Sequence, residues 1–578
     1  MKALIRDLRV LLTVALSMLL VACGGGGDDG SITGVADPDP TGNPPTPPVS
    51  YSLIEDQETA FRFLTMAAFG GSRADIDALV GRDAADWLAD QFAIPYASYV
   101  DRVIPLINPG VTAFADAPAT ESRHQMEMFW DAAIEGDDPL RQRMLFALSQ
   151  IIVANFNNAR NANREAYYLD NLGKHAFGNY RDILQDITYT PLMGSYLTYV
   201  GNRKGDPTTG RLPDENYARE ILQLFSTGLV DLQMNGEPIL VGGEPVETYG
   251  NDDIVNLARV FTGLVYDRDR GISGWWSPML MDEARHSELE KRFLNVVIPA
   301  NTDGTTSINL ALDGIFAHPN VAPFMARQLI QRFTASHPTP QYVERVATAF
   351  ETGTFAAGNG RTFGTGTRGD LEATLAAILL DPTLFDATTI ASDRVGKVRE
   401  PILRFVHWAR AFELSNVDSR QETRLRDTSS ASTALAQRPF GSPSVFNFYR
   451  PGYVAAGTLT GELGLTAPEF QIVNEGSAIG FGNFMTDYII NDTPFRDRDT
   501  FNASYATELA LADDADALVD HLALLLTGNQ VTDASRASIA NAIEAIGIRQ
   551  SDEAADRLSR VHLAIIMFVN DPSFTVTY

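Results

Sequence analysis

Along most of the chain after residue 51, apolar side chains recur at intervals of three and four residues. This spacing places them on one face of an α-helix, whereas a half-buried strand would alternate apolar and polar residues. The pattern is clear in 144–152, 180–187, 217–225 and 254–261. Such helices must bury their apolar faces against one another, so the pattern predicts an all-α fold.

Strand signals are scarce. Residues 237–248 predict a short hairpin, and 294–300 predict one strand. The 45% share of hydrophobic residues excludes an intrinsically disordered chain. We therefore expect one large multi-helix domain over 51–578 with minor β-hairpin decorations, in which a C-terminal helical sub-bundle could begin at about residue 500.

The first residues have the pattern of an export signal. A basic start is followed by an eleven-residue apolar run over 10–20, which is too short to span a bilayer. The run ends in Leu-Val-Ala-Cys at 20–23, and Cys23 is the only cysteine. This ending resembles the lipobox of bacterial lipoproteins, in which the matching cysteine carries the lipid. We expect 1–22 to be a lipoprotein signal peptide and Cys23 the lipidation site; the alternative is an ordinary signal peptide with a chance cysteine.

Residues 23–50 combine four consecutive glycines with six prolines and contain no aromatic or cationic residue. Such a segment cannot bury a core and predicts a tether that holds the folded part off the membrane. Glycine rather than aspartate follows Cys23. By resemblance to the proteobacterial sorting rule, this predicts the outer membrane of a Gram-negative bacterium.

Charge and residue type exclude several classes of function. The net charge is −28, from 73 acidic and 45 basic side chains. A surface this acidic repels nucleic acid and anionic headgroups, so the membrane link should be the lipid alone. One cysteine excludes an internal disulfide and a thiolate zinc site. The sequence also contains no His-Glu-x-x-His helix, Gly-x-Ser-x-Gly elbow or phosphate loop, and it identifies no metal or cofactor.

The most distinctive run is Pro-Asp-Glu-Asn-Tyr-Ala-Arg-Glu-Ile-Leu-Gln-Leu-Phe-Ser-Thr-Gly-Leu at Pro213–Leu229. It resembles the signature helix of the bacterial family called domain of unknown function 1800. Further blocks match in the same order, at 179–184, 258–264, 318–329, 437–453 and 468–471. The resemblance covers about residues 58–575. It implies a largely helical, exported protein, often encoded beside an alkaline-phosphatase-like secreted partner, and it implies no known reaction.

One departure from the family concerns histidine. Many members carry a Trp-His-Asn-His-like cluster after a Pro-Leu-Arg segment. Here Pro-Leu-Arg at 139–141 is followed by 144–150, Met-Leu-Phe-Ala-Leu-Ser-Gln, without a histidine. A metal site that depends on that cluster is not expected in this chain.

The signature helix contains the main candidate site residues. Glu215 and Arg219 are four residues apart and share a face, as do Asn216 and Glu220. Glu215 and Glu220 are separated by roughly 140° around the helix, so they do not form a carboxylate pair on one face. One interpretation is a capped amphipathic helix with a Glu–Arg pair. The other has these residues lining a polar cavity, with a carboxylate as general acid, general base or metal ligand.

Two further candidates lie in polar segments. His286 resembles one half of the family's His-Asp pair, with Ser287 in place of the acid, and could act as a base or ligand. Structural roles, at the surface or in a cap, are the alternative. The adjacent Trp275 and Trp276 lie beside glycines and could present flat faces to a sugar or lipid, or cap the core.

Two hypotheses of function follow. The first is an outer-membrane-anchored helical lipoprotein that acts as an envelope binding or accessory module for a secreted partner. The second is a hydrolase of an envelope or extracellular polymer, with Glu215 and Glu220 as catalytic carboxylates and His286 assisting. Convergence of Glu215, Glu220, Arg219 and His286 in one cleft would favour the enzyme, and their dispersal would favour the binding module.

Overall fold

The computed structural model describes residues 52–102, 124–156, 162–390, 396–416, 425–490 and 501–578. The chain from Val49 to Tyr578 forms one compact unit. The expected signal peptide, Cys23 and the tether lie outside the described residues.

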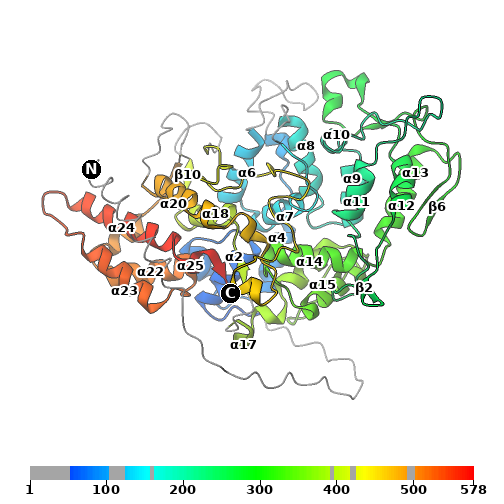
Figure 1. The fold of residues 1–578 in the computed structure, drawn as a ribbon. Helices are drawn as coiled ribbons and strands as arrows, with labels where there is room; N and C mark the ends of the chain where they lie inside the picture. The colour runs from blue at the N-terminus through cyan, green and yellow to red at the C-terminus, as the bar shows by residue number, and fades with distance from the viewer. Residues whose placement is uncertain (1–51, 103–123, 157–161, 391–395, 417–424, 491–500) are drawn as a thin grey trace, which may run out of the picture. The chain divides into compact units, whose positions relative to one another are not determined.

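Helices dominate the compact unit, as the apolar spacing predicts (Figure 1). In the first half they are α2 (Gln57–Ala67), α3 (Arg73–Leu79), α4 (Ala84–Ala93), α6 (His124–Ile134), α7 (Pro139–Ser149), α8 (Ala162–Gly173), α9 (Tyr180–Thr188), α10 (Pro191–Tyr196), α11 (Asn216–Gln223), α12 (Asn251–Val260) and α13 (Gly304–Phe316).

The second half continues in the same style. Its helices are α14 (Val321–Phe333), α15 (Pro340–Thr352), α16 (Leu371–Leu379), α17 (Ala387–Ile390), α18 (Pro401–Ala411), α19 (Leu459–Glu462), α20 (Glu475–Ile489), α21 (Ala506–Leu511), α22 (Ala515–Thr527), α23 (Asp533–Glu544), α24 (Glu553–Val569) and α25 (Pro572–Thr575). The 3₁₀ helices are η2 (Arg268–Trp275), η3 (Pro382–Leu384) and η4 (Pro468–Gln471). Among the described residues, no helix is both long enough and apolar enough to cross a bilayer.

The strands of the described residues form only two-stranded antiparallel ribbons. The pairs are β1 (Leu240–Val241) with β2 (Glu244–Pro245), β3 (Leu264–Val265) with β4 (Leu280–Met281), β5 (Lys291–Phe293) with β6 (Val296–Ile298), β7 (Phe355–Ala356) with β8 (Thr362–Phe363), β9 (Lys397–Val398) with β12 (Val576–Thr577), and β10 (Ser415–Asn416) with β11 (Phe501–Asn502). The all-α prediction with small hairpins is thus confirmed. The single strand expected over 294–300 is instead one arm of the β5–β6 hairpin, whose other arm begins at Lys291 and whose turn holds Leu294 at a φ of 47°.

Helix α7 lies at the centre of the packing. Every side chain from Pro139 to Leu148 is buried, and the helix contacts α2, α4, α6, α8 and α14 (Figure 1). The helices from about residue 500 pack on one another, as α22, α23 and α24. Because α22 also packs against α2 and α18, these helices belong to the same compact unit as the rest.

The signature run forms a shorter helix than its apolar stripe predicts. Helix α11 covers only Asn216–Gln223 of the expected Pro213–Leu229. Its start is delayed because Asp214 is tied to a loop, where its backbone N–H donates to Asn202 Oδ1 at 3.0 Å. Its end comes early because the backbone N–H groups of Thr227 and Gly228 turn back to the carbonyl of Leu222.

A buried carboxylate joins segments that are far apart in the sequence. Glu400, at the start of α18, is fully buried. Its Oε2 accepts hydrogen bonds from Gln150 Nε2 at 2.7 Å, from the Tyr449 hydroxyl at 3.0 Å and from Gln437 Nε2. We call these four residues the Glu400 cluster. It ties α7 and α18 to two loops of the last third of the chain.

Cations surround the Glu400 cluster. The buried Arg332 of α14 donates to the carbonyl of Gln150 at 3.1 Å, and the buried Arg143 of α7 donates to the carbonyl of Arg332. The charge of Glu400 favours the protonated form of both arginines, whose pKa values burial lowers. An uncompensated charge is costly in such an interior, so these groups stabilise the fold only as a set.

Replacing Glu400 by alanine should lower the free energy of unfolding by about 3–5 kcal/mol, because it leaves three hydrogen-bonding side chains and two buried arginines without their common partner. Chemical unfolding followed by circular dichroism measures the change. The control is Asp520→Ala, which removes an exposed ion pair with Arg536 and should cost less than about 1 kcal/mol. Equal losses in the two variants would contradict this account.

Candidate functional site

Asn216, one of the predicted site residues, takes part in hydrogen bonds at the start of α11. Asp214 accepts from the backbone N–H of Asn216 at 3.0 Å and from the Thr198 hydroxyl at 2.9 Å. The side-chain amide of Asn216 donates in turn to Thr198 Oγ1 at 2.8 Å. Asn216 thus helps to fasten the helix to the preceding loop.

Glu215 and Arg219 form the ion pair that their spacing predicts. Arg219 lies one turn after Glu215, and their side chains are 3.4 Å apart and about 43% and 34% exposed. An exposed pair of this kind is worth at most about 1 kcal/mol. Glu215 therefore faces solvent with its charge partly neutralised.

Glu220 has a different environment from Glu215. It is half-buried, and burial raises the pKa of its carboxyl group while the charge of Arg219 opposes the rise. Its Oε2 is shielded from solvent and has no hydrogen-bond partner. Such an oxygen costs free energy unless a ligand or water contacts it.

Two tyrosines share this environment. The hydroxyl of Tyr249 is likewise shielded and without a partner, and burial raises its pKa to about 12, with the charge of Glu220 adding to the rise. Burial and Glu220 also raise the pKa of Tyr196, at the end of α10. We call Tyr196, Arg219, Glu220 and Tyr249 the Glu220 cluster. All four are half-buried, so each has a part that solvent reaches.

The apolar face of α11 fixes this arrangement. Tyr217 is buried and stacks on Tyr199, with ring centroids 4.2 Å apart, and its edge meets Phe261 of the α12 end at 4.7 Å. These contacts set the rotation of the helix, and the side chains of Glu220 and Arg219 leave the helix on its other sides.

His286 lies in a separate, closed environment. The side chain is 2% exposed, and its Nδ1 lies 2.8 Å from the carbonyl of Thr262. Its Nε2 lies 3.1 Å from Lys291 Nζ and 3.2 Å from Ser307 Oγ. A carbonyl accepts only, so Nδ1 carries the proton and Nε2 accepts from the lysine.

The lysine that donates to His286 is buried as well. Lys291 is fully buried, its Nζ donates to Ser307 Oγ at 3.2 Å, and burial lowers its pKa to about 8. A histidine, a lysine and a serine in contact could carry out acyl transfer in an open site. Here all three are buried, so a substrate would have to open the fold to reach them.

Of the two adjacent tryptophans, the structure describes the side chain of Trp276. Trp276 is 1% exposed and packs in the interior, so it caps the core and offers no face to an external ligand. The side chain of Trp275 lies outside the described part of the chain.

His286 thus has different contacts from those of Glu215, Arg219 and Glu220. Within the described residues, no hydrogen bond or ion pair links His286 to Glu215, Arg219 or Glu220. In the same part of the chain, no three acidic, histidine or cysteine side chains are grouped to hold a metal ion. What the structure does assemble is the Glu220 cluster, whose tyrosines belong to no motif of the sequence.

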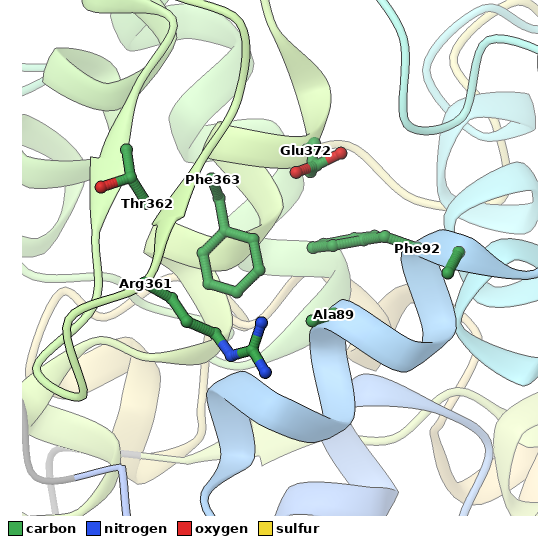
Figure 2. A pocket seen from close by; sticks show the side chains of 7 residues that line it. Ala89, Phe92, Arg361, Thr362, Phe363 and Glu372 are labelled. Carbon is green, nitrogen blue, oxygen red and sulfur yellow. The ribbon is translucent and has the colours of Figure 1, made fainter.

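The structure also contains a hollow that no sequence motif predicts. It has a volume of about 450 Å³ and is lined by α4, the β7–β8 ribbon and the first turn of α16 (Figure 2). Three of its seven lining residues, Arg361, Thr362 and Phe363, come from the glycine-rich stretch 353–370. Such a composition predicts only a loop, because glycine favours turns wherever they occur.

Acidification should destabilise the fold through His286. Burial lowers its folded pKa below the ordinary 6.5, so the unfolded chain takes up the proton first as the pH falls, and stability is lost below about pH 6.5. Thermal unfolding at pH 7.5 and pH 5.5 measures the loss. His286→Gln keeps an acceptor for Lys291 but does not titrate, and its midpoint should fall less; an unchanged pH dependence would refute the assignment.

Glu220→Gln should stabilise the protein at pH 7, by less than about 1 kcal/mol. The folded pKa of Glu220 is raised, so the folded state resists ionisation and stability falls as the pH rises above the unfolded value of 4.5. The matched control Glu215→Gln loses its pair with Arg219 and should not stabilise. Thermal midpoints at pH 4 and pH 7 test this, and a gain for Glu220→Gln that is as large at pH 4 as at pH 7 would contradict the cause.

Comparison with known proteins gives one match. No curated protein and no solved structure matches the chain. A family model described as "Protein of unknown function (DUF1800)" matches residues 62–576. This range contains the signature run, the Glu220 cluster, His286 and the hollow, and the chain therefore belongs to the DUF1800 family.

Proposed function

We propose that this protein is an exported lipoprotein, held at the outer membrane through lipid on Cys23, which acts as a binding or accessory module for a secreted partner. The apolar run, the lipobox-like ending and the tether support the anchor. An alkaline-phosphatase-like protein is the partner that the family resemblance implies.

The observation that carries the binding function is the dispersal of the candidate catalytic groups. Glu215 pairs with Arg219 at the surface, Glu220 is half-buried, and His286 is sealed between Lys291 and Ser307. Acid–base hydrolysis needs two groups placed on either side of one bond. Glu215, Glu220 and His286 have separate contacts and do not form such a pair, whereas binding needs only one suitable surface.

The Glu220 cluster is the part of the site most suited to contact a ligand. Its carboxylate and phenol oxygens without partners are shielded from solvent, but they lie next to the partly exposed guanidinium of Arg219, from which side a ligand can approach them. Polar groups placed beside aromatic rings suit polyhydroxylated ligands, because hydroxyls take the hydrogen bonds and C–H faces contact the rings. We propose that this cluster contacts an envelope glycan or a glycosylated partner surface.

The rival function is a hydrolase that uses Glu220 as its general acid. The raised pKa of Glu220 favours this role, since a carboxyl group that keeps its proton to a higher pH than usual is better placed to donate it to a leaving group. Such an enzyme would need a second group from the substrate or from the partner protein.

Affinity capture from envelope extracts separates the two functions. The wild-type protein should retain a specific glycan or partner, and Glu220→Ala or Tyr249→Ala should reduce the retention by about tenfold, which corresponds to the loss of one or two hydrogen bonds. Glu344→Gln, at an exposed position of α15 away from the cluster, is the control and should retain it. Turnover of the captured polymer by wild type and not by Glu220→Gln would establish the hydrolase instead.

The anchor has its own test. Cys23→Ser removes the only thiol of the chain, so the protein should lose lipid labelling and shift from the membrane fraction to the soluble fraction of the envelope. Metabolic labelling with palmitate and membrane flotation measure this. Labelling that persists in Cys23→Ser would overturn the proposed anchor.

A further inference from the structure

The hollow beside α4 is built from two small and two aromatic residues together with a charged group at each end. Ala89 and Ala93 of α4 are the two small lining residues. The rings of Phe92 and Phe363 line the middle of the hollow (Figure 2). The volume of about 450 Å³ lies within the range of about 300–1,000 Å³ that is usual for small-ligand sites.

The aromatic rings are held in place by other rings. Phe92 meets Phe363 edge to face, with centroids 5.6 Å apart, and meets Phe177 in the same way at 4.8 Å. Figure 2 shows the Phe92 and Phe363 rings side by side between Arg361 and Glu372. A ligand that enters the hollow therefore meets a rigid aromatic wall.

The two charged ends are not equivalent. Arg361 Nε lies 2.5 Å from Asp86 Oδ1, so its charge is neutralised by a residue of α4. Glu372 has one protein donor, the backbone N–H of Gly364 at 3.3 Å. Among the described residues, Glu372 has no ion-pair partner. Burial raises its pKa, the Gly364 hydrogen bond opposes the rise, and the charge of Asp370 adds to it.

We propose that this hollow binds an alkylammonium group, with the cation at Glu372 and its hydrocarbon stem against Phe92 and Phe363. A carboxylate beside aromatic rings is the chemistry that recognises organic cations. The acidic excess of the whole chain, 73 against 45, also attracts a cation and repels an anion. The site shares no residue with the Glu220 cluster, so it stands or falls independently of the proposed function.

An ammonium group can come from a free amine or from a lysine side chain of a partner. Calorimetric titration of the purified protein with n-butylammonium and with Nα-acetyl-lysine N-methylamide tests both sources. Millimolar binding of either supports the site, and tighter binding of the lysine probe points to a partner protein. The neutral 1-butanol and the anionic butyrate have the same stem and should bind at least about tenfold more weakly.

Substitutions that remove one charge and keep the shape of the side chain test the role of Glu372 in binding. Glu372→Gln keeps an acceptor for Gly364 and should weaken binding by about tenfold or more. Asp86→Asn releases the positive charge of Arg361 and should also weaken it. Glu344→Gln makes the same charge change at an exposed position of α15 and should have no effect.

Thermal unfolding of each variant establishes that it is folded before titration. The proposal is overturned if neither amine binds, if 1-butanol or butyrate binds as tightly as n-butylammonium, or if the folded Glu372→Gln protein keeps the wild-type affinity.

Discussion

The fold depends on charges that are buried together. The buried Glu400 accepts hydrogen bonds from Gln150, Gln437 and Tyr449, and two buried arginines lie nearby. A second buried pair, Lys397 with Glu469, continues this interior beside Ser336. Since breaking such a set costs more than forming it gains, the packing of α7, α14 and α18 has little freedom to vary. This rigidity gives the surface sites a fixed support.

Much of the fold follows from local patterns, and most of the site does not. The stripe of Tyr217 and Ile221 predicts the α11 helix because a helix repeats every 3.6 residues, and the structure buries both residues. The sequence could not reveal that Tyr249 shares the environment of Glu220, because their proximity depends on how loops pack. Nor could it show that His286 is sealed by Lys291, since a polar segment is typical of the surface.

The Glu220 cluster and the hollow share one physical property, although they share no residue. Each contains a half-buried carboxylate whose pKa burial raises. Such a group weakens the folded state at neutral pH, and groups with perturbed pKa values cluster at functional sites. The buried Lys291 differs from these carboxylates, because the protein itself supplies its hydrogen-bond partners, His286 and Ser307.

The β9–β12 ribbon has a consequence for the order in which the fold is completed. Val576 pairs with Val398, and Arg399 donates to the carbonyls of Phe574 and Thr575. The middle of the chain therefore lacks its backbone partners until residues 574–577 have been synthesised. During that interval the core around α18 cannot close, so the last residues to be made complete the packing of the middle of the chain.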